Sequence, residues 1–399
     1  MGNPLINKDF ALLAIGQFVS ATGDQVHQIA LLWWILDKTG SPAAMAALGM
    51  ASLVPAMVLG PFLGVFADKL DRKWVVVWMD FARAVLIGTV AGLALCGTLK
   101  LWHLYAATVL ASTASALFEP AVNALVPRIV PDSALKKSQA VQQGLNSMVG
   151  VYGPFLGGVL VGWVGISMVF LLNAISFFLS GVSEIFITYH HRVAQGRANP
   201  LLGVREGFRF IRKTRTLPWL MGMLACGNFA LAPMGTILVP FMIREVLHQT
   251  ARGLGLFFAF AGVGGVVGAV LAGGFQKSTQ HHRAVIVFPT LQGLLLASWG
   301  LAPSVVWTYT MAFLIGICAP LAQVNINMVF FKLVPDEMRG KVFAFRMTFL
   351  LIITPVALSA YGAIASVWTS SIPYLVVASG AILAAVAQLM RLVPGFRDL

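Results

Sequence analysis

A dense group of charges separates two long apolar runs at Gly64-Val65-Phe66-Ala67-Asp68-Lys69-Leu70-Asp71-Arg72-Lys73. Five of the last six residues are charged, in a chain where 10% of residues are. Charges at this density are too costly to place in the hydrocarbon of a bilayer. The stretch therefore predicts a short loop that joins two membrane-spanning helices.

The rest of the chain has the composition of a membrane protein. Hydrophobic residues make up 58% of it and the mean hydropathy is +0.85, far above a soluble domain. A helical span needs about 20 apolar residues. Twelve segments qualify, at 10–36, 43–67, 74–96, 101–125, 138–164, 166–189, 218–243, 253–275, 284–301, 305–330, 342–366 and 372–392. The predicted fold class is all-α and integral to the membrane, with no room for a soluble domain larger than a loop.

The net charge of +13 follows the predicted topology and does not indicate nucleic-acid binding. With the N-terminus inside, 21 of the 27 Lys and Arg residues fall at cytoplasmic positions. This is the positive-inside pattern of multi-pass membrane proteins. An even number of spans predicts that both termini are cytoplasmic, in a plasma or inner membrane.

Several patterns occur twice in the chain, about 204 residues apart. Asp24 corresponds to Asn228, and Val130-Pro131-Asp132 corresponds to Val334-Pro335-Asp336. Glu119 and Asn123 correspond in the same way to Gln323 and Asn327. The repeat predicts two six-helix bundles, at 1–189 and 218–399, related by a pseudo-twofold axis along the membrane normal. Residues 190–217 are expected to form a basic amphipathic linker at the cytoplasmic surface.

The charged loop and the fifth span resemble signatures of the major facilitator superfamily. The loop supplies Gly64, Asp68, Asp71, Arg72 and Lys73, and the resemblance implies that this loop acts in gating. A solvated loop that only fixes topology is the alternative. The fifth span is similar to the antiporter signature of the family, through Gly153, Pro154, Gly157 and Gly158.

Further segments resemble the drug:proton antiporter-3 branch, which includes macrolide-efflux proteins and siderophore exporters. These are Gly16–Ser20, Gly23-Asp24, Phe118–Ala121, Ala124–Pro127 and Leu171–Phe177. A lysophospholipid-transporter branch shares part of the pattern in the first span. In this superfamily spans 1, 4, 7 and 10 line the central cavity, and the polar residues matched by the repeat lie on those spans.

Asp24 is the strongest candidate for a functional residue. A carboxyl group in the middle of a span is a functional hypothesis by default, although a structural hydrogen bond is the alternative. Proton coupling or substrate binding is expected to involve Asp24, Glu119 and His27, and His27 alone also fits a packing role. The expected cavity lining is Gln17, Gln28, Asn123, Asn228, Gln323 and Asn327.

Buried charges inside spans are expected to pair. Asp80 and Arg83 lie one turn apart in the third span, at a depth comparable to Glu119, so an Asp80–Arg83–Glu119 network is expected. Arg346 is the second arginine within a span and the approximate counterpart of Arg83.

Together these patterns predict a secondary transporter that exports amphipathic small molecules such as drugs, macrolides or siderophores in exchange for protons. A lipid carrier such as a lysophospholipid flippase is the alternative. No nucleotide-binding loop, nucleophile motif or metal-ligand cluster is present in the sequence, which disfavours an enzyme and indicates neither a cofactor nor a metal. The expected partners are the small amphipathic substrate, protons and the bilayer, and the expected state is a monomer.

Overall fold

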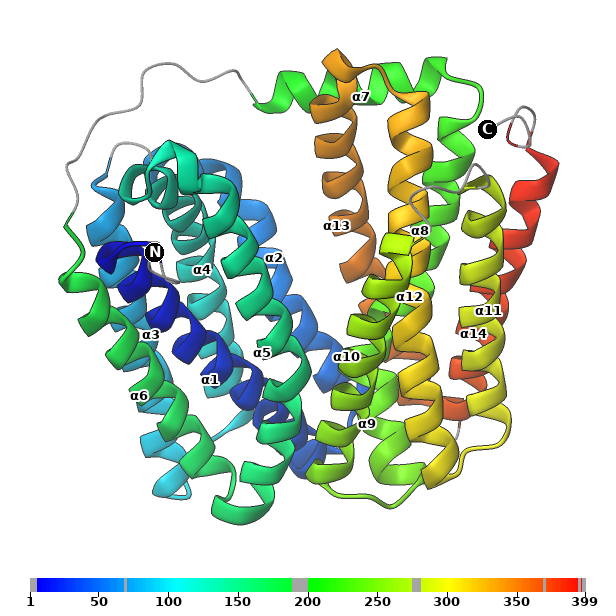
Figure 1. Ribbon diagram of the computed structural model, residues 1–399. Helices are drawn as coiled ribbons and strands as arrows, with labels where there is room; N and C mark the ends of the chain where they lie inside the picture. The colour runs from blue at the N-terminus through cyan, green and yellow to red at the C-terminus, as the bar shows by residue number, and fades with distance from the viewer. Residues whose placement is uncertain are drawn as a thin grey trace. The chain divides into compact units, whose positions relative to one another are not determined.

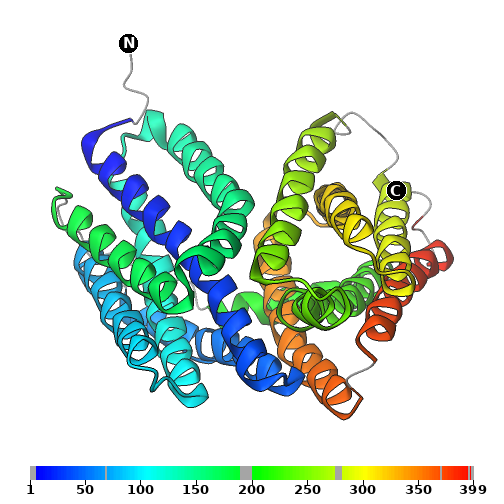
Figure 2. The same cartoon turned by 90° about the horizontal axis from the view of Figure 1, so that it is seen from below.

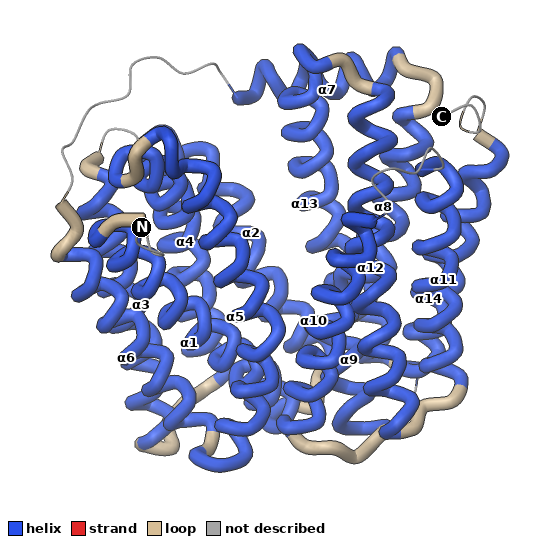
Figure 3. The backbone as a smooth tube through the Cα atoms, in the orientation of Figure 1, coloured by secondary structure: helices blue, strands red, loops and turns tan. Residues whose placement is uncertain are grey.

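The computed structural model describes residues 6–67, 70–188, 200–274, 281–368, 371–393 and 396. Within these ranges the regular structure is helical throughout and contains no strand (Figure 3). An apolar chain in a bilayer must satisfy its backbone hydrogen bonds within each segment, which a helix does. The predicted all-helical membrane fold is confirmed.

The first half of the chain contains six long helices (Figure 1). Their bounds, with a short 3-10 turn η1, are α1 Lys8–Thr39, α2 Pro42–Ala67, α3 Arg72–Leu95, α4 Leu101–Ile129, η1 Asp132–Ala134, α5 Leu135–Val164 and α6 Ile166–Ile185.

The second half begins with a surface helix, α7, and then continues with long helices. The bounds are α7 Pro200–Lys213, α8 Leu217–Pro233, η2 Met234–Leu238, α9 Val239–Phe241, η3 Met242–Val246, α10 Ala251–Gly274, α11 His281–Leu301, α12 Val305–Leu333, α13 Asp336–Val367, α14 Ile372–Leu389 and η6 Met390–Leu392. The segments η2 and η3 are π-helical and follow their neighbours without a break in the helix. Helices α8 through η3 therefore form one span, Leu217–Val246.

Eleven of these segments are long and apolar enough to cross a membrane, among the residues described. Helix α1 is the remaining long helix of the first half, and its 32 residues exceed the bilayer thickness. Its hydropathy is lower because polar residues such as Gln17, Asp24 and His27 lie within it. By length, α1 could be the twelfth span that the sequence predicts.

The helices form two compact units. The first contains α1, α3 to α6, α2 from Ala47 onward and the beginning of α10 through Ala259. The second contains the first turn of α2 and the remainder of the chain from α7 onward.

Helix α1 is the centre of the first unit, where it lies between α5 and α6 (Figure 2). Glycines allow this close packing. A Cβ added at Gly157 of α5 would lie 3.0 Å from the Cα of Val26, and one at Gly153 would lie 2.7 Å from the Cβ of Gln25. Gly158, the next glycine of the antiporter-like motif, is packed against the first turns of α10. The motif therefore holds helix backbones together, and its Pro154 is buried in α5.

The charged loop ends in a helix cap. The Asp71 side chain accepts a hydrogen bond of 3.0 Å from the backbone N–H of Lys73 and so begins α3, and the side chain of Arg72 is buried. Gly64 lies in the last turns of α2. Asp68 lies outside the described residues, so the gating role stays a prediction.

The linker helix α7 packs against α13. A side chain at Gly207 would meet the backbone of Lys341, and Glu206 forms an ion pair with the Lys341 ammonium group. The hydrogen bond and charge of Lys341 lower the pKa of Glu206. Ile211 is buried in the core of the second unit, so part of the apolar face expected to lie on the bilayer instead contacts protein.

Replacing Gly157 by Leu should destabilise the first unit by about 1–3 kcal/mol, because the new side chain overlaps the backbone of α1. Gly150→Leu is the matched control on the same helix, where an added Cβ meets no atom within 4 Å. Thermal unfolding of both variants in detergent measures the difference. Equal apparent Tm values for the two variants would contradict the close packing of α1 on α5.

Candidate functional site

The site is built around the middle of α1. Gly23 lies so close to α6 that a side chain there would meet Asn173 and Ser176. This close approach brings the next residue, Asp24, against the Asn173 amide, which donates a hydrogen bond of 3.3 Å to one carboxylate oxygen. Two segments that carry the resemblance to drug antiporters, Gly23-Asp24 and Leu171–Phe177, therefore meet in space.

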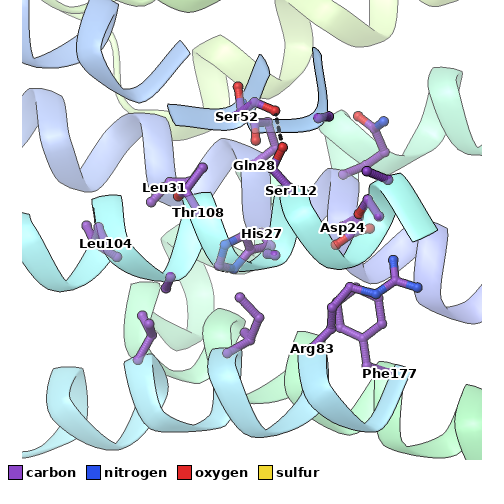
Figure 4. A pocket seen from close by; sticks show the side chains of 18 of the residues that line it. Asp24, His27, Gln28, Leu31, Ser52, Arg83, Leu104, Thr108, Ser112 and Phe177 are labelled. Atoms are coloured by element: carbon purple, nitrogen blue, oxygen red, sulfur yellow. Dashed lines mark hydrogen bonds between the residues drawn. The ribbon is translucent and has the colours of Figure 1, made fainter. Parts of the chain in front are cut away.

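Asp24 opens onto two cavities of the first unit, of about 450 Å³ and 400 Å³. Four residues line both of them, namely Asp24, Arg83, Ser115 and Glu119. In Figure 4, Asp24 and Arg83 lie next to one another in the larger cavity. Its side chains come from α1, α2, α3, α4 and α6. Asp24 is exposed in this cavity.

Arg83 is held from two directions. One nitrogen donates to the Oδ1 of Asp80, which is fully buried. The guanidinium carbon also lies 4.1 Å from the ring centre of Phe118 and 4.5 Å from that of Phe177. Stacking between two rings and pairing with a carboxylate fix the orientation of an arginine. The predicted pairing of Asp80 with Arg83 is present.

Glu119 does not complete the predicted network. It lines both cavities with Arg83, but within the described chain it forms no ion pair or hydrogen bond. Its side chain is exposed, because α4 turns this face toward the cavity and Pro120 follows directly. The expectation of an Asp80–Arg83–Glu119 network was wrong in this respect. Asn123, one turn further, lines the smaller cavity.

The other polar residues of α1 differ in their surroundings. Gln17 accepts a hydrogen bond of 3.1 Å from Gln142, and Gln28 is exposed in the larger cavity. His27 also lines that cavity, with its ring 4.8 Å from the ring of Phe170. Its Nδ1 is buried and forms no hydrogen bond within the part of the chain that the structure describes, which fits a packing role.

The matched residues of the second unit form their own hydrogen bonds. Asn228 accepts one from Thr354 at 3.0 Å, and Gln323 donates one to Asn327 at 3.1 Å. Arg346 donates to the same Asn327 oxygen at 2.8 Å. Its guanidinium also lies over two rings.

Arg346 therefore resembles Arg83 in its surroundings but not in its place in the fold. Arg83 is on α3, whereas Arg346 is on α13, where the repeat offset matches it to Gln142 of α5. The two arginines belong to different units, and the expected functional role of Arg346 as a buried charge stays a prediction.

Sequence reasoning assigned no role to Asn173, Gln142 or Glu184. Asn173 was inside a quoted motif, but its contact with Asp24 spans 149 residues of sequence. Glu184 did carry a signal, since an acidic residue inside an apolar helix is itself a functional hypothesis. It lies in the last turn of α6 and is 1% exposed.

The family is decided by a match to the model described as Major Facilitator Superfamily, which covers residues 13–358. This chain belongs to the Major Facilitator Superfamily. An uncharacterized MFS-type transporter of Bacillus subtilis is 26% identical over 86% of this chain and 84% of its own length. Macrolide efflux protein A of Streptococcus pyogenes is 21% identical over 88% and 87%.

A solved structure agrees with the fold. A bacterial homologue of the iron transporter ferroportin, in an inward-facing state, superposes with a TM-score of 0.75 at 19% identity, covering 95% of this chain and 97% of that one. The protein is therefore a multi-pass membrane transporter of the major facilitator fold, and the predicted resemblance to that superfamily is confirmed.

The exposure of Glu119 gives a direct test of the cavity. After replacement of Cys96, Cys226 and Cys318 by serine, Glu119→Cys should react with a charged, water-soluble thiol reagent. Leu125→Cys is the control on the same helix, because Leu125 is fully buried. Mass spectrometry of the labelled protein measures the reaction. Equal labelling of the two cysteines, or labelling of the second alone, would contradict a water-accessible cavity at Glu119.

Proposed function

We propose that this transporter exports amphipathic, cationic small molecules in exchange for inward-moving protons, from a plasma or inner membrane with both termini cytoplasmic. The observation that carries the proposal is Asp24, an exposed carboxyl group in the middle of α1 and in the wall of a cavity. The excess of Lys and Arg at cytoplasmic positions supports the orientation.

A carboxyl group of this kind couples two ligands by competition. Either a proton or the positive charge of the substrate neutralises Asp24, and both together are disfavoured. Facing outward, proton binding to Asp24 releases the cation. Facing inward, loss of that proton to the cytoplasm allows the next cation to bind. Such exclusive occupancy is what antiport by alternating access requires.

The larger cavity suits a molecule with both apolar and basic parts. Its volume of about 450 Å³ is within the usual range for small-molecule sites. Leu31, Ile87, Leu104 and Phe177 supply apolar walls, and Glu119 supplies a second exposed carboxyl group. The similarity to macrolide efflux protein A of Streptococcus pyogenes supports the same substrate class.

A lysolipid is less well accommodated. Its phosphate would need a basic group, and Arg83 is the basic residue in the wall of both cavities. That guanidinium is paired with Asp80 and stacked on two rings. The carboxyl groups of Asp24 and Glu119 would also repel the phosphate. These contacts therefore favour a cationic substrate over a lysolipid.

Asp24→Asn should abolish accumulation of a lipophilic cation or a macrolide driven by a pH gradient, because it removes the titratable group and keeps the hydrogen-bonding shape. Binding of the substrate should remain measurable. Asp37→Asn is the matched control on α1, with an exposed side chain near the end of the helix. Transport into inverted vesicles with an imposed pH gradient measures the effect.

Wild-type accumulation by the Asp24→Asn variant would remove Asp24 from proton coupling. Lysolipid transport that requires Arg83, in a protein that binds no cation at any pH, would replace the export proposal with the lipid alternative.

A further inference from the structure

A second acidic site lies behind the cavity wall, between α3 and α6. Glu184 is 1% exposed, and both of its carboxyl oxygens are buried without a hydrogen bond in the described structure. Gly181, one turn earlier, lies beside α3, where an added Cβ would be 3.5 Å from the Cβ of Asp80, an ordinary packing distance. The hydroxyl group of Ser180 lies near both carboxyl groups but meets hydrogen-bond geometry with neither.

If Asp80, Arg83 and Glu184 are all ionised, this buried group carries two negative charges and one positive charge. Asp80 is fully buried and Arg83 is 6% exposed, and the Oδ1 of Asp80 accepts the hydrogen bond from Arg83. The Oδ2 of Asp80 has no partner in the described chain. Arg83 contacts Asp80, and within the described residues Glu184 has no such contact. A buried carboxylate with neither a donor nor a counter-charge is very costly, whereas the protonated acid costs much less.

The neighbouring helices supply two further acids. From α1, Asp24 lines both cavities together with Arg83 and is exposed there. Asp9, near the cytoplasmic end of α1, accepts a hydrogen bond of 2.8 Å from the backbone of Thr188, just beyond α6. Neither provides a positive charge for Glu184. Since Arg83 already contacts Asp80, the unpaired acid is Glu184.

We propose that Glu184 is a second proton-binding residue of this transporter, which carries a proton at neutral pH and exchanges it with the cytoplasm. Glu184 lies in the last turn of α6, the end of that helix that the predicted topology places at the cytoplasmic side. The exchange role rests on the proposed proton coupling, whereas the bound proton rests only on the buried charges.

Arg83 connects this residue to the cavity. Its guanidinium lines both cavities and also contacts Asp80. When Asp24 is ionised, its negative charge in the wall of the same cavities disfavours a further negative charge on the buried acids, which then hold their proton more firmly. When a proton or a substrate cation neutralises Asp24, the positive charge of Arg83 acts only on the buried acids, Asp80 and Glu184. Glu184 then releases its proton more readily. The occupancy of the cavity is in this way transmitted to the cytoplasmic end of α6.

Dicyclohexylcarbodiimide, which reacts with protonated carboxyl groups in apolar surroundings, is the probe for the bound proton. At neutral pH the intact protein in detergent should be labelled at Glu184, as located by peptide mass spectrometry. In Asp80→Asn the guanidinium of Arg83 is left to Glu184, which ionises, and labelling should fall more than roughly tenfold, as expected for a charge-assisted bond. Asp132→Asn, an exposed acid, should leave labelling unchanged.

A second measurement covers the case in which Asp80→Asn does not fold. If Glu184 is neutral, Glu184→Gln should keep the apparent Tm of the wild type while slowing proton-driven transport. An unlabelled Glu184 in the wild type, or a large loss of stability in Glu184→Gln, would overturn the proposal. Labelling at Glu184 does not depend on transport, so failure of the export function is detected separately, by Asp24→Asn.

Discussion

The structure of the first unit depends on the cost of placing one guanidinium group, Arg83, inside a bundle of apolar helices. Such a charge is stable there only when paired and enclosed. Asp80 supplies the pairing, and the rings of Phe118 and Phe177 supply the enclosure. Because these partners are on α3, α4 and α6, the single charge fixes the relative positions of three helices. The same group forms part of the wall of both cavities.

Glycines make this arrangement possible. Between helices in a bilayer there is little hydrophobic driving force, so contact between backbones and hydrogen bonds must hold the bundle together. Gly23 brings α1 against Asn173 of α6, and Gly157 brings α5 against α1. A polar residue on α1 is therefore placed by the small residue next to it. Together, Gly23 and Asp24 determine where the carboxyl group lies and which residue, Asn173, donates a hydrogen bond to it.

The spans and the fold class could be predicted from sequence, because hydropathy is a local signal. An isolated charge within a span, such as Asp24, is a local signal too, and its functional role stays a prediction. The contacts that define the site could not. The hydrogen bond from Asn173 to Asp24 joins residues 149 positions apart, and no local pattern gives the rotation of α6 that brings them together. Depth alone suggested Glu119 as a partner of Arg83, but the rotation of α4 directs Glu119 into the cavity. Arg346 was compared with Arg83 because both are arginines within spans, whereas the repeat places it on the helix equivalent to α5.

The central claim is that protons and a cationic substrate compete for the acids around Arg83. Proton release on substrate binding tests it most directly. A lipophilic cation is added to the purified transporter in weakly buffered detergent solution, and a pH indicator records the protons released. The account predicts release in proportion to the substrate bound, at a pH where Asp24 is partly protonated, and a smaller release in Asp24→Asn. Saturable binding of the cation with no proton release at any pH would contradict it.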